Sequence, residues 1–131
     1  MIKVDTSCCS RFHIFDQARQ LQKKGLLNNI IHCHPNYHLK RFQVDLNKSI
    51  NNSFIGYLNY IGKYLPNFID NKLQKYVTLE TDLFIRNTLI KKKTKPDIFI
   101  GLSSFITKTI DHCNENNITS VVDHGSLHPE Y

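Results

Sequence analysis

The stretch PDIFIGLSSFITKTIDHCNENNITSVVD, residues 96–123, decides the fold. It opens with a continuous apolar run between Pro96 and Gly101, which is the pattern of a short strand buried on both faces of a parallel sheet. Hydroxyl residues that suit a helix start follow, and apolar residues then recur with helical spacing. Residues 118–123 return to the β-branched composition of a strand. The stretch therefore predicts a strand, a helix and a second strand parallel to the first.

The N-terminal third of the chain repeats this order. Residues 1–6 alternate apolar and polar side chains, as a strand does. A helix is predicted between Ser10, a preferred N-cap residue, and Gly25, a common helix stop. Residues 30–33 are a short β-branched run that Pro35 closes in a polar turn. Together the two units predict an α/β fold with a Rossmann-like parallel sheet and helices on both faces.

The middle of the chain has the spacing of two helices. Apolar residues keep a helical period over residues 54–65 and again over residues 67–93, and Pro66 separates the two patterns. Gly56 and Gly62 weaken the first of these predictions, because glycine lowers helix propensity. The second pattern ends in three consecutive lysines, which suit a helix C-terminus.

The composition indicates one globular domain over residues 1–131. Of the 131 residues, 40% are hydrophobic and 11% aromatic, which is enough for one core. The formal charge of +6 favours anionic partners such as phosphates, sugar nucleotides or acidic lipids. The basic residues are dispersed, which argues against nucleic-acid binding. No apolar run reaches the roughly 20 residues that cross a bilayer and no leader pattern opens the chain, so a cytoplasmic protein is expected.

Cysteine and histidine residues raise the question of a disulfide or a metal site. Four cysteines occur without any C-x-x-C spacing, and we predict buried or semi-buried free thiols. A second group of imidazole and thiolate side chains has the chemistry of zinc ligands. Its first three members are consecutive on a predicted strand, so their side chains alternate between opposite faces and no metal site is predicted. The four cysteines are Cys8, Cys9, Cys33 and Cys113. The group with zinc-ligand chemistry is His32, Cys33, His34 and His38.

Three loops should meet at one edge of the sheet. The carboxyl ends of parallel strands face the same way, so the loops SCCSRFH, GLSSF and DHGSLHPEY are expected to converge. Arg11 could pair with a phosphate and His13 could exchange hydrogen bonds with a ligand, although both also suit an exposed first helical turn. Ser103 and Ser104 could bind a ligand or only cap the following helix.

The last of these loops has ligand-binding chemistry without a known hydrolase motif. Gly125 would let the backbone approach a ligand closely, and Ser126 and His128 supply hydrogen-bonding groups. The chain lacks G-x-S-x-G and both glycine-rich nucleotide motifs. Neither a serine hydrolase nor a complete nucleotide pocket is therefore indicated.

Two long segments together resemble family 4 glycosyltransferases of the GT-B fold. They are SRFHIFDQARQLQKKGLLNNIIHCHP, residues 10–35, and KPDIFIGLSSFITKTIDHCNENNITSVVDHGSLHPEY, residues 95–131. The resemblance covers both ends of the chain in the order of the family, while residues 45–90 carry only a helical pattern. It implies two Rossmann-like domains that face a cleft, of which this chain is an incomplete N-terminal one. It also implies that the chain stops inside a loop of that cleft, as the product of a truncated or split gene, or a fragment, would.

The resemblance assigns most of the same residues to a substrate site. His128 is the candidate catalytic residue, because its match in the family is expected to contact the sugar or the acceptor, and His124 stands where the family has an arginine. The resemblance also implies that the transfer needs no metal and no cofactor, since charges and helix dipoles of the donor domain would stabilise the departing nucleotide diphosphate. The expected substrate-binding residues are Arg11, Phe12, His13, Ser103, Ser104, Gly125 and Ser126.

The implied function is transfer of a sugar from a nucleotide-sugar donor to a glycan or lipid-linked acceptor. The chain alone would be inactive, and a second polypeptide would supply the donor domain. One alternative is a non-catalytic binding module that completes its sheet with a partner chain. Another is a module at the inner face of the cell membrane, whose helix could equally pack in the core. That alternative uses Phe54, Tyr57, Leu58 and Ile61 with Lys40, Arg41 and Lys63.

Overall fold

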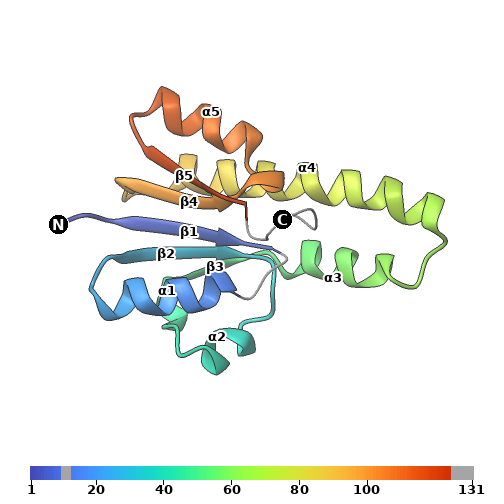
Figure 1. Ribbon diagram of the computed structural model, residues 1–131, viewed down its shortest axis with the longest axis horizontal. Helices are drawn as coiled ribbons and strands as arrows, with labels where there is room; N and C mark the ends of the chain where they lie inside the picture. The colour runs from blue at the N-terminus through green and yellow to red at the C-terminus, as the bar shows by residue number, and fades with distance from the viewer. Residues whose placement is uncertain (10–12, 125–131) are drawn as a thin grey trace, which may run out of the picture.

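The computed structural model describes residues 1–9 and 13–124, which contain a five-stranded sheet in the order β3-β2-β1-β4-β5 (Figure 1). Every neighbouring pair of strands is parallel. The predicted α/β fold with a Rossmann-like parallel sheet is therefore confirmed. The strands are β1 (Val4–Cys8), β2 (Leu27–His32), β3 (Ser49–Asn51), β4 (Ile98–Leu102) and β5 (Thr119–Asp123).

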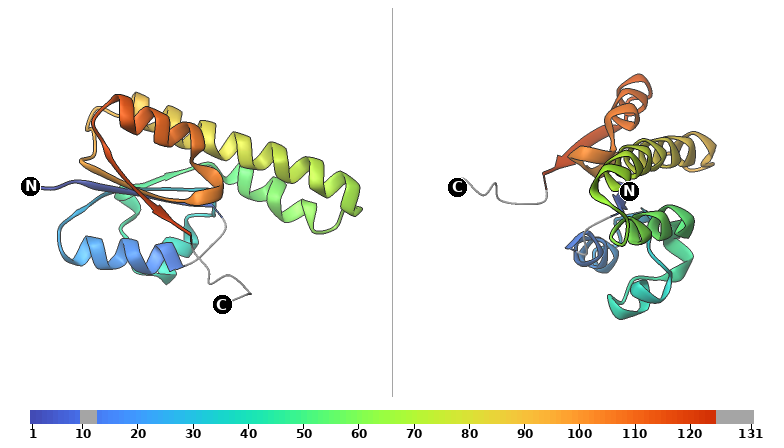
Figure 2. Two further views of the ribbon diagram at one scale, coloured as in Figure 1. Left: turned by 45° about the horizontal axis from the view of Figure 1, so that its top comes forward. Right: turned by 90° about the vertical axis from the view of Figure 1, so that its right-hand side faces the viewer.

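Helices cover both faces of the sheet, as predicted. Helices α1 and α2 lie on one side and α4 and α5 on the other, while α3 lies beside α4 (Figure 2). Two short 3₁₀ helices, η1 and η2, precede β3 and α5. The bounds are α1 (His13–Lys23), α2 (Tyr37–Arg41), η1 (Leu46–Lys48), α3 (Ser53–Gly62), α4 (Asn67–Lys91), η2 (Ser103–Phe105) and α5 (Thr107–Glu115).

Strand β2 shows how one strand serves both layers of the core. Ile30 is fully buried in the cluster that contains Phe15 of α1, on one face of the sheet. Its neighbour Ile31 is fully buried in the cluster that contains Ile85 and Leu89 of α4, on the other face. Because successive side chains of a strand point to opposite faces, a central strand needs consecutive apolar residues. The unbroken apolar runs of the sequence have this cause.

No pattern in the sequence predicted α2 or β3. Helix α2 has five residues and buries Leu39, and β3 has three residues, none of them fully buried. Neither carries an apolar period long enough to be recognised. Strand β3 is held to β2 partly by polar side chains, since His32 Nε2 lies 2.7 Å from Ser49 Oγ.

The two glycines of α3 mark close helix contacts. A Cβ atom on Gly56 would overlap the carbonyl oxygen of Cys33, and one on Gly62 would overlap the carboxylate of Asp70 in α4. Helix α3 therefore approaches the end of β2 and helix α4 more closely than a larger residue would allow. The residues that weakened the helix prediction are the ones that let this helix pack.

Asp82 ties α4 to α5. Its carboxylate accepts hydrogen bonds from the backbone N–H of Lys108 at 2.8 Å, and from the N–H and hydroxyl of Thr109 at 2.9 and 2.7 Å. These N–H groups belong to the first turn of α5 and have no partner within that helix. A side chain from α4 therefore caps α5, in the role usually taken by a residue of the same helix.

A buried ion pair ties the end of α4 to the central strand. The Lys92 ammonium contacts the Asp5 carboxylate, and the two side chains are 8% and 0% exposed. Asp5 Oδ1 also accepts hydrogen bonds from the Asn28 side chain at 2.9 Å and the Asn29 backbone at 3.0 Å. Burial raises the pKa of Asp5, and its bond to Lys92 opposes that shift. The carboxylate therefore depends on its partners to remain charged inside the protein.

Helix α4 is longer than the sheet beneath it. Its 25 residues span about 37 Å at 1.5 Å per residue, whereas a five-residue strand spans about 17 Å. The first part of α4 and helix α3 accordingly project beyond the sheet (Figure 1). None of residues 67–76, the outer half of α4, is buried, whereas Val77 and four later residues of the inner half, residues 77–91, are.

Candidate functional site

The carboxyl ends of β1, β4 and β5 lie along the same edge of the sheet. After β1 the chain continues to β2 and β3 on one side, and after it returns at β4 it continues to β5 on the other. The strand order therefore reverses between β1 and β4. Such a switch point opens a crevice between the loops that follow the two strands, and α/β proteins bind ligands there.

His13 and Asp123 join two of the predicted loops at this edge. His13 Nε2 lies 2.9 Å from Asp123 Oδ2, although 110 residues separate them. His13 is the first residue of α1 and Asp123 the last of β5, and their side chains are 43% and 27% exposed. When Nε2 donates to the carboxylate, Nδ1 keeps its lone pair and can accept a proton from a hydroxyl group.

Ser103 and Ser104 lie in η2, directly after β4. Ser103 is partly buried and Ser104 is exposed. The alternative that they cap the following helix is wrong, because α5 begins at Thr107 and Asp82 supplies its cap. Both serines therefore lie in the connection between β4 and α5, and Asp82 caps α5 in their place.

Several predicted site residues lie outside the described part of the chain. They are Arg11 and Phe12 in the first loop, and Gly125, Ser126 and His128 in the last. Their predicted roles stay predictions. Asp123 was not predicted as a site residue, although an acidic residue that closes an apolar strand is a signal that could have identified it.

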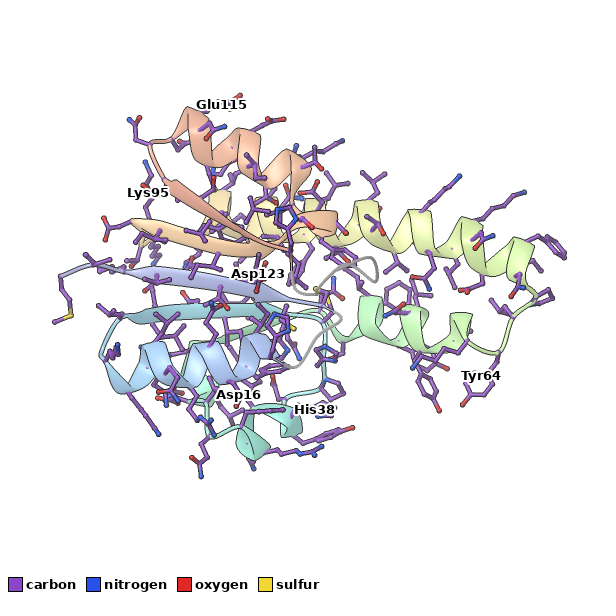
Figure 3. All side chains as sticks on the ribbon, in the orientation of Figure 1. Asp16, His38, Tyr64, Lys95, Glu115 and Asp123 are labelled. Carbon is purple, nitrogen blue, oxygen red and sulfur yellow. A yellow bond between two sulfur atoms is a disulfide. The ribbon has the colours of Figure 1, made fainter. Side chains whose placement is uncertain are left out.

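A pocket of about 510 Å³ lies between α2 and α3, next to the carboxyl end of β2. Its volume is within the range of small-molecule sites. His38 is one of the residues that line it. In Figure 3, His38 and Asp123 both lie toward the end of the sheet beyond which α3 and α4 project. The lining residues are Cys33, His34, Pro35, Tyr37, His38, Ser53, Gly56, Tyr57, Asn59, Tyr60 and Lys63.

The end of β2 alternates between the two faces, as predicted. The rings of His32 and His34 lie 5.7 and 5.6 Å from the ring of Phe15, on the side of α1. Cys33 packs on the opposite side with Ile55 of α3. Burial lowers the pKa of both histidines to about 4, and the neighbouring imidazoles add to this shift. In residues 1–9 and 13–124, no group of three His, Cys, Asp or Glu residues is arranged to hold a metal ion.

A disulfide joins Cys9 and Cys33, which corrects the prediction of buried thiols for these two residues. Strands β1 and β2 are neighbours with Cys8 opposite His32, so the residues that follow them lie side by side. The Cα atoms of Cys9 and Cys33 are 4.9 Å apart. The two cysteines are 24 residues apart in the sequence, and no local pattern indicated that they are in contact. The bridge connects the first loop of the switch point to the wall of the pocket.

The surface of α3 differs from that of a helix packed in the core. Phe54 and Tyr57 are 64% and 60% exposed, while Ile55 is buried against Val77 of α4. Leu58 is partly buried in the same cluster. The aromatic residues of the membrane alternative therefore face solvent. Within the described residues, no helix combines the length and apolar character needed to pass through a bilayer.

Strand β5 forms one edge of the described sheet. Val121 and Val122 are 45% and 37% exposed on it. An edge strand with exposed apolar residues can pair with another strand. The partner-chain alternative depends on this feature.

No protein-family model, curated protein or solved structure matches the chain.

Proposed function

We propose that this chain is the acceptor-side domain of a glycosyltransferase. The enzyme would move a sugar from a nucleotide-sugar donor to a hydroxyl group of a glycan or lipid-linked acceptor, and a second domain or polypeptide would bind the donor. The observation that carries the proposal is the contact of His13 with Asp123. It joins, at a switch point of the sheet, the two segments that resemble family 4 glycosyltransferases.

The His13–Asp123 pair supplies a site for proton transfer. During the reaction the acceptor oxygen bonds to the anomeric carbon of the donor sugar, and the bond from that carbon to the nucleotide diphosphate breaks. The hydroxyl proton passes to His13 Nδ1, while Asp123 holds the other ring nitrogen and stabilises the imidazolium. The nucleotide diphosphate leaves as an anion, and the positive end of the α1 dipole favours negative charge beside His13.

The remaining site residues keep the roles that the resemblance implies. Arg11 and Phe12 would face the donor phosphates or the transferred sugar. Ser103 and Ser104 would contact substrate from the second loop. The last loop would add Gly125, Ser126 and the imidazole of His128.

A transfer assay tests the proposal. The chain is supplied alone and together with any polypeptide encoded directly downstream, with UDP-glucose, UDP-N-acetylglucosamine and GDP-mannose as donors and a panel of glycan and lipid-linked acceptors. We expect transfer when both polypeptides are present and none with the chain alone. His13→Gln should lower kcat by about 100-fold or more with little change in KM. Asp123→Asn should lower kcat and change the pH profile.

The matched control is Asp111→Asn, at an exposed position of α5, which should leave kcat unchanged. Absence of transfer in both arrangements would contradict the proposal. So would transfer that His13→Gln leaves at the wild-type rate.

A second candidate function is attachment to an anionic membrane surface through α3. The exposed Phe54 and Tyr57 of α3, together with Lys63 directly after α3, favour it. Flotation with liposomes of phosphatidylglycerol and phosphatidylcholine tests it. Salt-sensitive binding that Phe54→Ser abolishes would support this function, and absence of the chain from the lipid fraction would exclude it.

A further inference from the structure

The pocket between α2 and α3 has aromatic walls on two sides. Tyr57 and Tyr60 are three residues apart, so they lie on the same side of α3. Tyr37 comes from the start of α2. The three residues are 60%, 54% and 67% exposed in that order, although large apolar rings are usually covered. Exposed tyrosines around a concave site present flat apolar faces with a hydroxyl at the rim.

The polar lining of the pocket suits a ligand rich in hydroxyl groups. Ser53 and Asn59 contribute a hydroxyl and an amide, each able to donate and to accept. His34 is neutral near pH 7, because burial lowers its pKa to about 4, and a neutral imidazole both donates and accepts. A wholly apolar ligand would make no use of these donors and acceptors.

The charge of the pocket is positive. Lys63 lines it, and its Nζ lies 5.9 Å from the centroid of the Tyr60 ring. No acidic residue is among the lining residues. Residues 33–65, which build α2 and α3, contain four basic residues and one acidic residue, Asp45. A ligand placed on the Tyr60 ring would therefore meet a cation and no opposing carboxylate.

We propose that this pocket binds an acidic sugar, a pyranose that carries a carboxylate or a phosphate. The flat face of the sugar lies on Tyr57 or Tyr60, its hydroxyl groups bond to Ser53 and Asn59, and its anionic group pairs with Lys63. The inference rests on the proposed function for one point, that the bound sugar is the acceptor. The Cys9–Cys33 disulfide links the wall of the pocket to the loop that leads to His13, so an acceptor held here adjoins the switch point.

Titration of the ¹⁵N-labelled chain followed by NMR tests the inference. The probes are methyl β-glucuronide, glucose 6-phosphate, methyl β-glucoside, uridine monophosphate and inorganic phosphate. Both acidic sugars should shift the amide signals of residues 33–38 and 56–63. Each should bind at least about tenfold more tightly than the neutral glucoside, as expected for a hydrogen bond to a charged group. Comparison of the two acidic sugars identifies whether the carboxylate or the phosphate is preferred.

Matched variants separate the parts of the pocket. Lys63→Gln should abolish the tenfold preference for acidic sugars, and Lys72→Gln on the outer half of α4 should retain it. Tyr57→Leu should weaken binding of every sugar about three- to tenfold, through loss of the aromatic face. Tyr76→Leu, which changes a tyrosine that is 50% exposed and lies away from the pocket, should not.

Three results would overturn the inference. They are equal affinity for the glucoside and the acidic sugars, equal shifts by inorganic phosphate alone, and tighter binding of uridine monophosphate than of either sugar. The transfer assay with His13→Gln does not depend on the charge of the acceptor. Failure of the acidic-sugar titration therefore leaves the proposed function standing, and failure of the transfer assay leaves a sugar-binding pocket without that function.

Discussion

The two halves of α4 are held in opposite ways. The inner half buries Val77, Thr81, Asp82, Ile85 and Leu89, caps α5 through Asp82, and is followed by the Lys92–Asp5 ion pair. The outer half buries no residue, packs beside α3 and exposes Phe68 and Tyr76 to solvent. One continuous helix therefore serves two environments.

This difference separates stability from recognition. Local stability follows the number of buried contacts, so the inner half should belong to the cooperative core and the outer half should open at lower cost. The proposed sugar pocket lies on α3, which packs against Asp70 of the outer half through Gly62 and against Val77 at the start of the inner half through Ile55. We expect substitutions in the two halves to differ in their effect on the free energy of unfolding.

Lys92→Met should cost about 3–5 kcal/mol of unfolding free energy. The change leaves the Asp5 carboxylate buried without its cation. Denaturation by urea measures the loss, and Lys91→Met, at an exposed neighbouring position, is the control with little expected effect. Equal stability of the two variants would mean that the ion pair does not hold the inner half in place.

Acid should lower the free energy of unfolding of the protein through the buried His32. The pKa of His32 is lowered to about 4 from 6.5, so the unfolded chain takes up a proton at a pH where the folded chain does not. Stability from this group is present above pH 6.5 and is lost as the pH falls from about 6.5 to about 4, by about 3 kcal/mol. Urea unfolding at several pH values measures it.

His32→Asn should remove this part of the pH dependence. His124→Asn, at an exposed position, should keep the wild-type dependence. An unchanged slope in the His32 variant would contradict the assignment.

Asp82→Ala should cost about 2 kcal/mol, because it removes the cap of α5 and leaves two N–H groups of its first turn without that partner. Asp70→Ala on the outer half removes one hydrogen bond to Gln74 and should cost much less. Thermal unfolding followed by circular dichroism compares the two. A larger loss for the Asp70 variant would reverse the proposed difference between the halves.

Tyr76→Leu should change the unfolding free energy by less than about 0.5 kcal/mol, since the side chain is 50% exposed in the outer half. Chemical denaturation is sensitive enough to bound this value. Amide hydrogen exchange should also be faster over residues 67–76 than over residues 81–89. A cost above about 1 kcal/mol would show that the outer half belongs to the core.

The alternation of apolar strands with amphipathic helices was sufficient to predict the parallel sheet. The long helices of the protein were also predicted, because their apolar residues keep a helical period over many residues. Strand β3 was missed because it is short and half-buried, and because the His32–Ser49 side-chain contact that adds to its backbone pairing with β2 has no periodic signal. Gly56 and Gly62 were misleading, because helix propensity does not report close packing.

The candidate site was predictable only in part. Convergence of the strand ends follows from a parallel sheet, and it placed His13 near the last loop. The partner Asp123, the Cys9–Cys33 bridge and the pocket depend on which strands and helices become neighbours. Strand order and the position of α2 set these contacts, and neither is contained in a local pattern.

The most direct test of the central claim is hydrogen–deuterium exchange of the chain with and without a tetrasaccharide of alternating glucuronate and N-acetylglucosamine. If the carboxyl edge of the sheet binds an acidic sugar, exchange should slow in residues 33–38, 56–63 and 119–124 together. Slower exchange confined to residues 67–76, or no change anywhere, would contradict the claim.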